Sequence, residues 1–154
     1  MWEPLQRYNA LEPASRRMFR RAAILLPWLR WSLRLRGYSK TFASLHKRVP
    51  PAAKETENRP GEPEEVRAAC RMVIAALRYS LLQYTCLEES LTLWYLLRKQ
   101  GIAACLRIGV RKENEKFEAH AWVEVDAAVL NDASAEHLHF TPFDGPISPL
   151  EART

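Results

Sequence analysis

Apolar residues recur at helical spacing in three stretches of the chain. The first stretch begins at Pro13, a residue that the first turn of a helix tolerates, and has an apolar face on which Arg side chains are scarce. Its apolar members are Met18, Ala22, Leu25, Leu26 and Leu29. Pro27 predicts a kink or a division in this helix, and Gly37 predicts its end.

Two further helices are predicted in the middle of the chain. One begins near Glu62 with acidic residues in its first turn, which suits a helix N-terminus. Its apolar stripe consists of Val66, Ala69, Cys70, Val73, Ile74, Leu77 and Leu81. The other helix runs from Thr85 to Gln100 and ends at Gly101.

Beyond Gly101 the pattern changes to the alternation that is typical of strands. Residues 106–110 and 119–125 alternate, and residues 129–130 follow closely, which predicts three strands. The last two form a tight hairpin around Asp126 and Ala127, although that turn lacks the glycine that such hairpins favour.

Helices followed by an antiparallel sheet predict an α+β fold. We expect a basic helical region over residues 1–49 and a linker or surface loop over residues 50–63, which is polar and contains four prolines. The α+β domain covers residues 64–145, and residues 146–154 form a tail. In this α+β domain, helices would pack on a small antiparallel sheet, and the basic N-terminal region would form an additional helical layer.

Charge divides the chain in the same way. The 154 residues carry a net charge of +5, but residues 1–50 contain eleven Lys and Arg against two acids, whereas the remainder contains twelve against sixteen. Such asymmetry indicates that the basic part meets an acidic partner, a membrane surface or nucleic acid.

The composition excludes several classes of protein. The longest apolar run, residues 22–29, is far shorter than the roughly 20 residues of a membrane span. Three cysteines and no secretory signal favour free thiols and a cytoplasmic location. No glycine-rich phosphate loop is present, so no nucleotide and no other cofactor is expected.

Cys86 is the strongest candidate for a nucleophile. Thr85 and Glu88 have the spacing of a capping box, which places Cys86 at the first position of its helix. The helix dipole and free N–H groups there favour a thiolate, and the same N–H groups could stabilise an oxyanion.

The predicted hairpin supplies a base and an orienting group. His120 lies in the middle of one strand, and Asp132 follows the next. With a turn at residues 126–127, residue 120 pairs with residue 133 or 134, so Asp132 lies near His120 across the ladder. These three residues predict a Cys-His-Asp site.

Trp122 shares the strand face of His120 and is a candidate wall of that site, although packing in the core is its ordinary role, as for Trp94. Cys70 and Cys105 are expected to be buried packing residues. A zinc site made of Cys70, Cys105, His137 and His139 lacks the usual ligand spacing, so no metal is expected. His137 and His139 could bind a metal only by chance, from one face of a strand.

Several segments resemble the lasso-peptide leader peptidases. The resemblance covers residues 64–135 closely, through CLEESLTLWYLLRKQG from Cys86, LRIGV from Leu106, FEAHAWVEV from Phe117 and VLND ending at Asp132. It extends more loosely over the Arg- and Leu-rich residues 25–36. One departure is Asp126-Ala127, where Asp-Gly is expected.

The resemblance implies a transglutaminase-like or papain-like cysteine protease. In that family Cys86 would be the nucleophile, His120 the general base and then acid, and Asp132 the orienting carboxylate. The substrate would be the leader of a ribosomally made precursor peptide, cut after a leader whose penultimate residue is Thr. The partners would be a separate leader-recognition protein and an asparagine-synthetase-like cyclase.

Two other functions remain open at this point. An acyltransferase could use the same triad to transfer the acyl group to an amine instead of water. A binding module could use the basic N-terminal half to hold nucleic acid or an acidic peptide, with an inactive triad.

Overall fold

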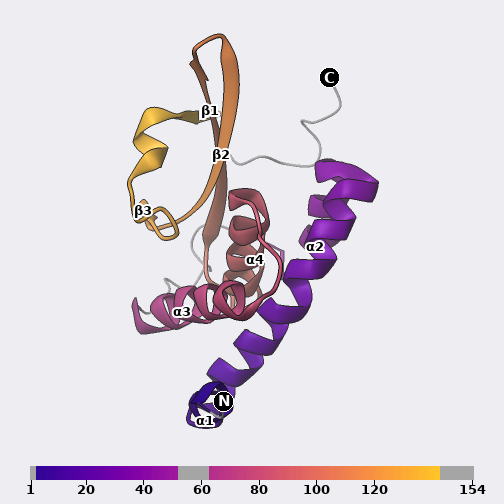
Figure 1. Cartoon of the computed structure of the whole chain (residues 1–154), viewed down its shortest axis with the longest axis vertical. Coiled ribbons are helices and arrows are strands. Elements are labelled where there is room, and N and C mark those ends of the chain that lie inside the picture. Colours follow the sequence, from indigo (N-terminus) through magenta and orange to yellow (C-terminus); the bar gives the residue numbers. More distant parts are fainter. Residues whose placement is uncertain (1–2, 52–62, 143–154) are drawn as a thin grey trace.

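The computed structural model describes residues 3–51 and 63–142. Within them, helices come first and an antiparallel sheet follows, so the predicted α+β class is confirmed (Figure 1). The helices are α1 (Glu3–Asn9), α2 (Pro13–His46), α3 (Pro63–Tyr79) and α4 (Cys86–Lys99). The strands are β1 (Ala104–Glu113), β2 (Lys116–Val125), β3 (Ala128–Val129) and β4 (Thr141–Pro142), and a 3-10 helix covers Glu136–His139. Most of the predicted linker and the whole predicted tail lie outside the described residues.

Helix α2 turns back on itself at Gly37. This glycine has a φ of 76° and a ψ of 174°, which interrupt the helix where the sequence predicts an end. The hydroxyls of Ser32 and Thr41 are 2.8 Å apart, so the segment after Gly37 returns alongside the segment before it. Pro27 lies inside α2 without non-helical dihedral angles, so the predicted division at Pro27 is wrong. The backbone reverses only at the residue that tolerates a positive φ.

Helix α3 packs on α2 and α4 through a face that differs from the predicted stripe at four positions. Met72 and Ala76 are buried, whereas Ile74 is 56% exposed. Leu81, predicted to extend the stripe, lies beyond the helix end at Tyr79 and is fully exposed. The burial of Val66, Ala69 and Val73 agrees with the prediction.

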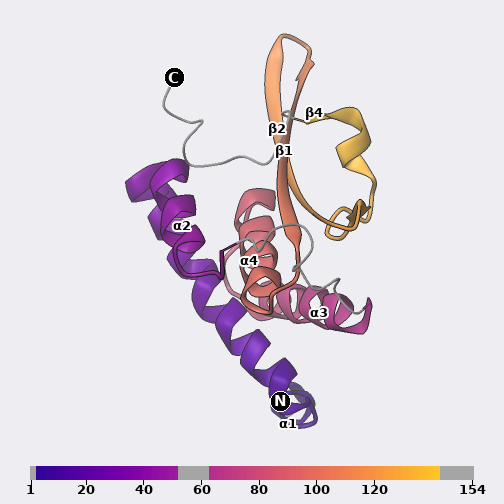
Figure 2. The same cartoon turned by 180° about the vertical axis from the view of Figure 1, so that it is seen from behind.

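Helix α4 lies between α2 and the β1–β2 hairpin in both views (Figures 1 and 2). Because it is covered on both sides, its buried residues occur almost all round the helix: Leu91, Leu93, Trp94, Leu96 and Leu97. They share one core with Leu26 and Leu29 of α2 and with Val123 of β2. The predicted bounds of this helix are confirmed to within a residue.

The sheet has the order β3-β2-β1-β4 and is antiparallel throughout. The predicted hairpin around Asp126 and Ala127 is confirmed, because Val125 pairs with Ala128. Both turn residues have positive φ values, 50° and 64°, so this turn adopts the left-handed conformation without a glycine. His120 of β2 pairs with Gly109 of β1.

Two predictions about the sheet region are wrong. Cys105 is exposed, because it alternates with the buried residues Ala104 and Leu106 on β1. His137 and His139 belong to a 3-10 helix, whereas the sequence suggested one face of a strand.

Candidate functional site

Cys86 is the first residue of α4, as the capping pattern predicts. The Thr85 side chain accepts a hydrogen bond from the Glu88 N–H at 3.3 Å, and the Glu88 carboxylate accepts one from the Thr85 N–H at 2.7 Å. Glu88 is 5% exposed, whereas Cys86 is only half-buried and its thiol is free. The positive end of the helix dipole and the free N–H groups of the first turn therefore lie at a half-buried cysteine.

One helical turn after Cys86, Ser90 joins α4 to the sheet and to the loop after β3. Its hydroxyl donates to the carbonyl of Ala121 at 2.9 Å and accepts from the Asn131 side chain at 2.8 Å. The Asn131 side-chain oxygen in turn accepts from the Val123 N–H at 2.8 Å. Residues four apart share a helix face, so the face of α4 that carries Cys86 is directed at the neighbours of His120 and Asp132.

Asp132 and His120 lie near one another, but not through the predicted ladder. Strand β3 ends at Val129, and Asp132 comes from the loop that follows. One of its carboxylate oxygens, Oδ1, is 3.7 Å from His120 Nε2. Both side chains are largely covered, at 13% exposure for His120 and 3% for Asp132. Within the described residues, His120 Nε2 is buried without a hydrogen-bond partner.

The other Asp132 oxygen is held by His137, a residue that sequence reasoning had considered only as a chance metal ligand. The His137 N–H donates to Oδ2 at 2.6 Å, and His137 Nδ1 is 2.5 Å from the same oxygen. Burial favours the neutral carboxyl, but the hydrogen bonds from His137 and Glu136 outweigh it and leave the pKa of Asp132 below its usual value. Asp132 is therefore a fixed carboxylate with one oxygen turned toward His120.

Aromatic rings hold the His120 imidazole in place. The Trp122 ring centroid lies 5.9 Å away in a stacked arrangement, and the Phe140 centroid lies 5.3 Å away. Trp122 is 2% exposed, so its ring supports His120 from within the core. A Cβ at Gly109 would come within 2.9 Å of both Trp122 and Phe140, so the strand opposite His120 leaves room for this packing.

Glu89 is a second titratable group on the first turns of α4. Burial raises its pKa, while a hydrogen bond from Asn131 partly offsets that effect. It lines a hollow of about 670 Å³ with Leu77 and the segment 80–84 that leads to Cys86. The i+3 spacing from Cys86 was the only sequence signal that could have identified it. Burial likewise raises the pKa of the Cys70 thiol, in agreement with a packing role.

The residues of the dismissed zinc site do not come together. Among residues 3–51 and 63–142, no group of three or more His, Cys, Asp or Glu side chains has an arrangement that could hold a metal ion. In the same described ranges, no helix combines the length and apolar character that a membrane crossing requires.

Comparison with protein families gives one finding. The family model described as the transglutaminase-like superfamily matches residues 23–144, which span α2 from Ala23 onward, α3, α4 and the sheet. No curated protein and no solved structure matches this chain significantly.

Proposed function

Because the chain belongs to the transglutaminase-like superfamily, which includes cysteine peptidases and acyltransferases, we propose that it is a cysteine peptidase. Cys86 is the nucleophile, His120 the general base and then acid, and Asp132 the carboxylate that orients the imidazole. The observation that carries the proposal is the pair of bonds made by Ser90 to Ala121 and Asn131. They fix the Cys86 face of α4 against the immediate neighbours of His120 and Asp132.

The chemistry follows the roles of these groups. The Cys86 thiolate attacks the carbonyl carbon of the scissile peptide bond, and the N–H groups at the start of α4 stabilise the oxyanion. His120 protonates the leaving amine as the bond to nitrogen breaks, leaving a thioester. Water, deprotonated by His120, then attacks the thioester and releases the acid, and the proton returns to the sulfur.

The geometry of His120 and Asp132 suits a general base and the carboxylate that orients it. Nε2 is the imidazole nitrogen that faces Asp132, so the other nitrogen, Nδ1, is the one available to the sulfur. The separation of 3.7 Å is longer than a hydrogen bond, and such contacts commonly shorten when substrate binds. The low pKa of Asp132 keeps the carboxylate charged and able to stabilise the imidazolium.

The substrate we propose is the leader of a lasso-peptide precursor, cleaved with a separate leader-recognition protein and followed by an asparagine-synthetase-like cyclase. The support for this assignment is the residue pattern around Cys86, His120 and Asp132. This substrate assignment is more specific than membership of the superfamily, so it needs its own test.

The test is cleavage of the precursor by the purified chain with the recognition protein present. Cys86→Ala and His120→Ala should lower the rate by about 10³-fold or more, while circular dichroism and thermal unfolding stay close to wild type. Ser134→Ala, an exposed substitution in the loop of Asp132, serves as the matched control and should cleave normally. Full cleavage by Cys86→Ala would overturn the mechanism.

An acyltransferase is the second candidate, favoured by membership of a superfamily that also contains such enzymes. It would share every step up to the thioester and differ in the acceptor, an amine in place of water. Mass spectrometry separates the two, because hydrolysis adds water and shortens the peptide, whereas transfer creates a new amide.

A further inference from the structure

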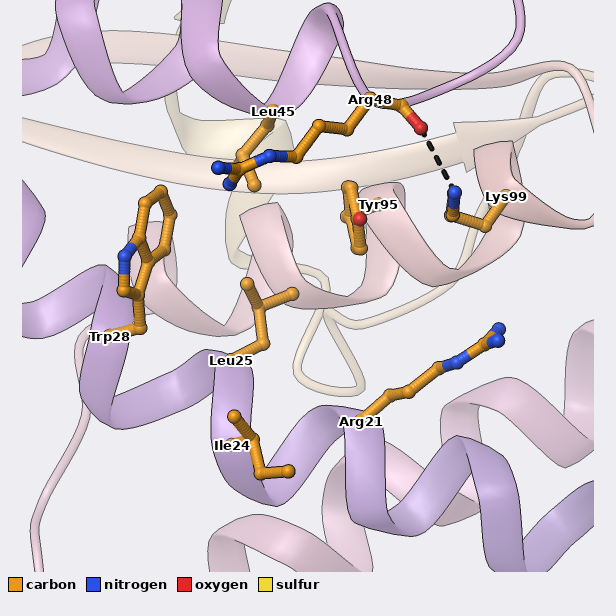
Figure 3. A pocket seen from close by; sticks show the side chains of 8 residues that line it. All are labelled: Arg21, Ile24, Leu25, Trp28, Leu45, Arg48, Tyr95 and Lys99. Carbon is orange, nitrogen blue, oxygen red and sulfur yellow. Dashed lines mark hydrogen bonds between the residues drawn. The ribbon is translucent and has the colours of Figure 1, made fainter.

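A cavity lies at the opposite end of α4 from Cys86, between α4 and the two halves of α2. Its volume is about 440 Å³, within the range of ligand pockets. Figure 3 shows its apolar side chains facing one another across the opening. They come from both helices: Ile24, Leu25, Trp28, Leu45 and Tyr95.

Three cations surround this apolar centre. Lys99 donates to the backbone carbonyl of Arg48 at 3.0 Å, and the Arg48 guanidinium lies 5.7 Å from the Trp28 ring centroid. Arg21 extends from α2 and is exposed (Figure 3). None of the eight residues that line the cavity is acidic. The positive charge at this opening is therefore not neutralised by the cavity's own walls.

Exposed apolar residues continue from the cavity along α2. Ile24 is 72% exposed, Trp31 61% and Leu35 77%. With Trp28 they have the spacing of one helix face, which a monomeric protein rarely leaves uncovered. Apolar area beside cations that no acidic residue of the cavity lining neutralises is complementary to a polypeptide segment that carries acidic residues around a large apolar side chain.

We propose that this cavity docks an acidic segment of the peptide substrate, away from the scissile bond, with one aromatic or branched aliphatic side chain inserted beside Trp28. Identification of the occupant as substrate rests on the proposed peptidase function. Helix α4 has 14 residues, so at about 1.5 Å each its two ends lie about 20 Å apart. An extended chain of at least about six residues would span that distance.

The first experiment measures binding without catalysis. In the Cys86→Ala protein, fluorescence anisotropy follows a short labelled peptide in which Asp and Glu residues flank one phenylalanine. Arg21→Glu should weaken binding about tenfold because it replaces attraction by repulsion at the opening. Arg34→Glu makes the same charge change at another exposed position of α2 and should bind as the parent does. Replacing the phenylalanine by alanine in the peptide, or adding salt, should also weaken binding.

Other results would overturn the docking proposal. They are no binding of the probe, equal losses in Arg21→Glu and Arg34→Glu, or self-association of the chain that Arg21→Glu abolishes, which would assign this surface to a second copy. A cleavage assay keeps the two proposals apart. Arg21→Glu should raise KM for the precursor and leave kcat unchanged, whereas failure of the peptidase function would remove cleavage from wild type and leave the binding difference intact.

Discussion

The two ends of α4 are built in different ways. At the N-terminal end, Glu88, Ser90 and Asn131 fix their neighbours through directional hydrogen bonds between buried or half-buried groups. At the C-terminal end, Tyr95 and Lys99 border a cavity with apolar walls and cations. Bond-making needs atoms held within a fraction of an ångström, which hydrogen bonds provide. Docking depends on contact area and charge complementarity, which do not require such precise atomic positions. Substitutions at the first end should therefore change reaction rates and stability, and those at the second should change affinity.

Asp132→Ala should have the largest combined effect. It removes the carboxylate that faces His120 and the acceptor of two hydrogen bonds from His137. We expect cleavage to fall by about 10³-fold or more and the free energy of unfolding to fall by about 3 kcal/mol. Urea denaturation and the precursor assay measure the two losses. An unchanged rate in a folded protein would remove Asp132 from the site.

Asp132→Asn tests the charge of this side chain separately through pH. The pKa of Asp132 is lower in the folded protein than its usual value of 3.8, so ionisation stabilises the fold above that value. The difference in unfolding free energy between wild type and Asp132→Asn should be constant at neutral pH. It should shrink only as the pH falls below about 4 and through the folded pKa. A difference that shrinks between pH 8 and 5 would contradict this account.

Asn131→Ala should come next in its effect on stability. Its side chain accepts from the Val123 N–H and donates to the Ser90 hydroxyl, so truncation leaves the buried Val123 N–H without its acceptor and the Ser90 hydroxyl without one of its two partners. The expected loss is about 2–3 kcal/mol in the free energy of unfolding. The reactivity of Cys86 toward iodoacetamide should also change, because the α4 face is no longer held against the loop. Ser134→Ala in the same loop should leave both measurements unchanged.

Gly109→Ala should lower the free energy of unfolding by less, and it should affect His120 through the rings of Trp122 and Phe140. The added Cβ would lie 2.9 Å from atoms of Trp122 and Phe140, both of which must shift. Overpacking of this kind costs about 1–3 kcal/mol. The imidazole resonances of His120 should move in NMR spectra because the stacked Trp122 ring moves. Unperturbed resonances would mean that the rings do not position His120.

The local patterns around Cys86 predicted its environment well. The Thr-x-x-Glu spacing and Gly101 depend on residues within one or two helical turns, and the structure reproduces both ends of α4. The hairpin at Asp126 and Ala127 also formed as predicted. Asp132 does lie near His120, but the strand pairing from which this was expected ends at Val129. Asp132 approaches His120 from the loop that follows.

The features that sequence reasoning missed depend on contacts between distant segments. His137 reaches Asp132 because the chain forms a 3-10 helix after β3, and no periodic pattern marks so short an element. The cavity beside Trp28 exists because α2 reverses at Gly37 and returns Leu45 and Arg48 to its first half. Ile74 is exposed because of the way α3 packs on its neighbours. The amphipathic pattern of α3 alone does not define that packing.

Thr85→Ala should have the smallest effect on stability among these substitutions, and it separates the two ends of α4 most cleanly. It removes the acceptor for the Glu88 N–H at the helix start, so a loss of about 1 kcal/mol is expected. Fraying of the first turn weakens the dipole and the free N–H groups at Cys86, so alkylation at neutral pH should slow. Thr85→Ser keeps the acceptor and should restore the rate. Anisotropy of the acidic peptide should not change in either variant, because Tyr95 and Lys99 lie at the far end of the helix. A parallel loss of peptide affinity would show that the two ends are coupled.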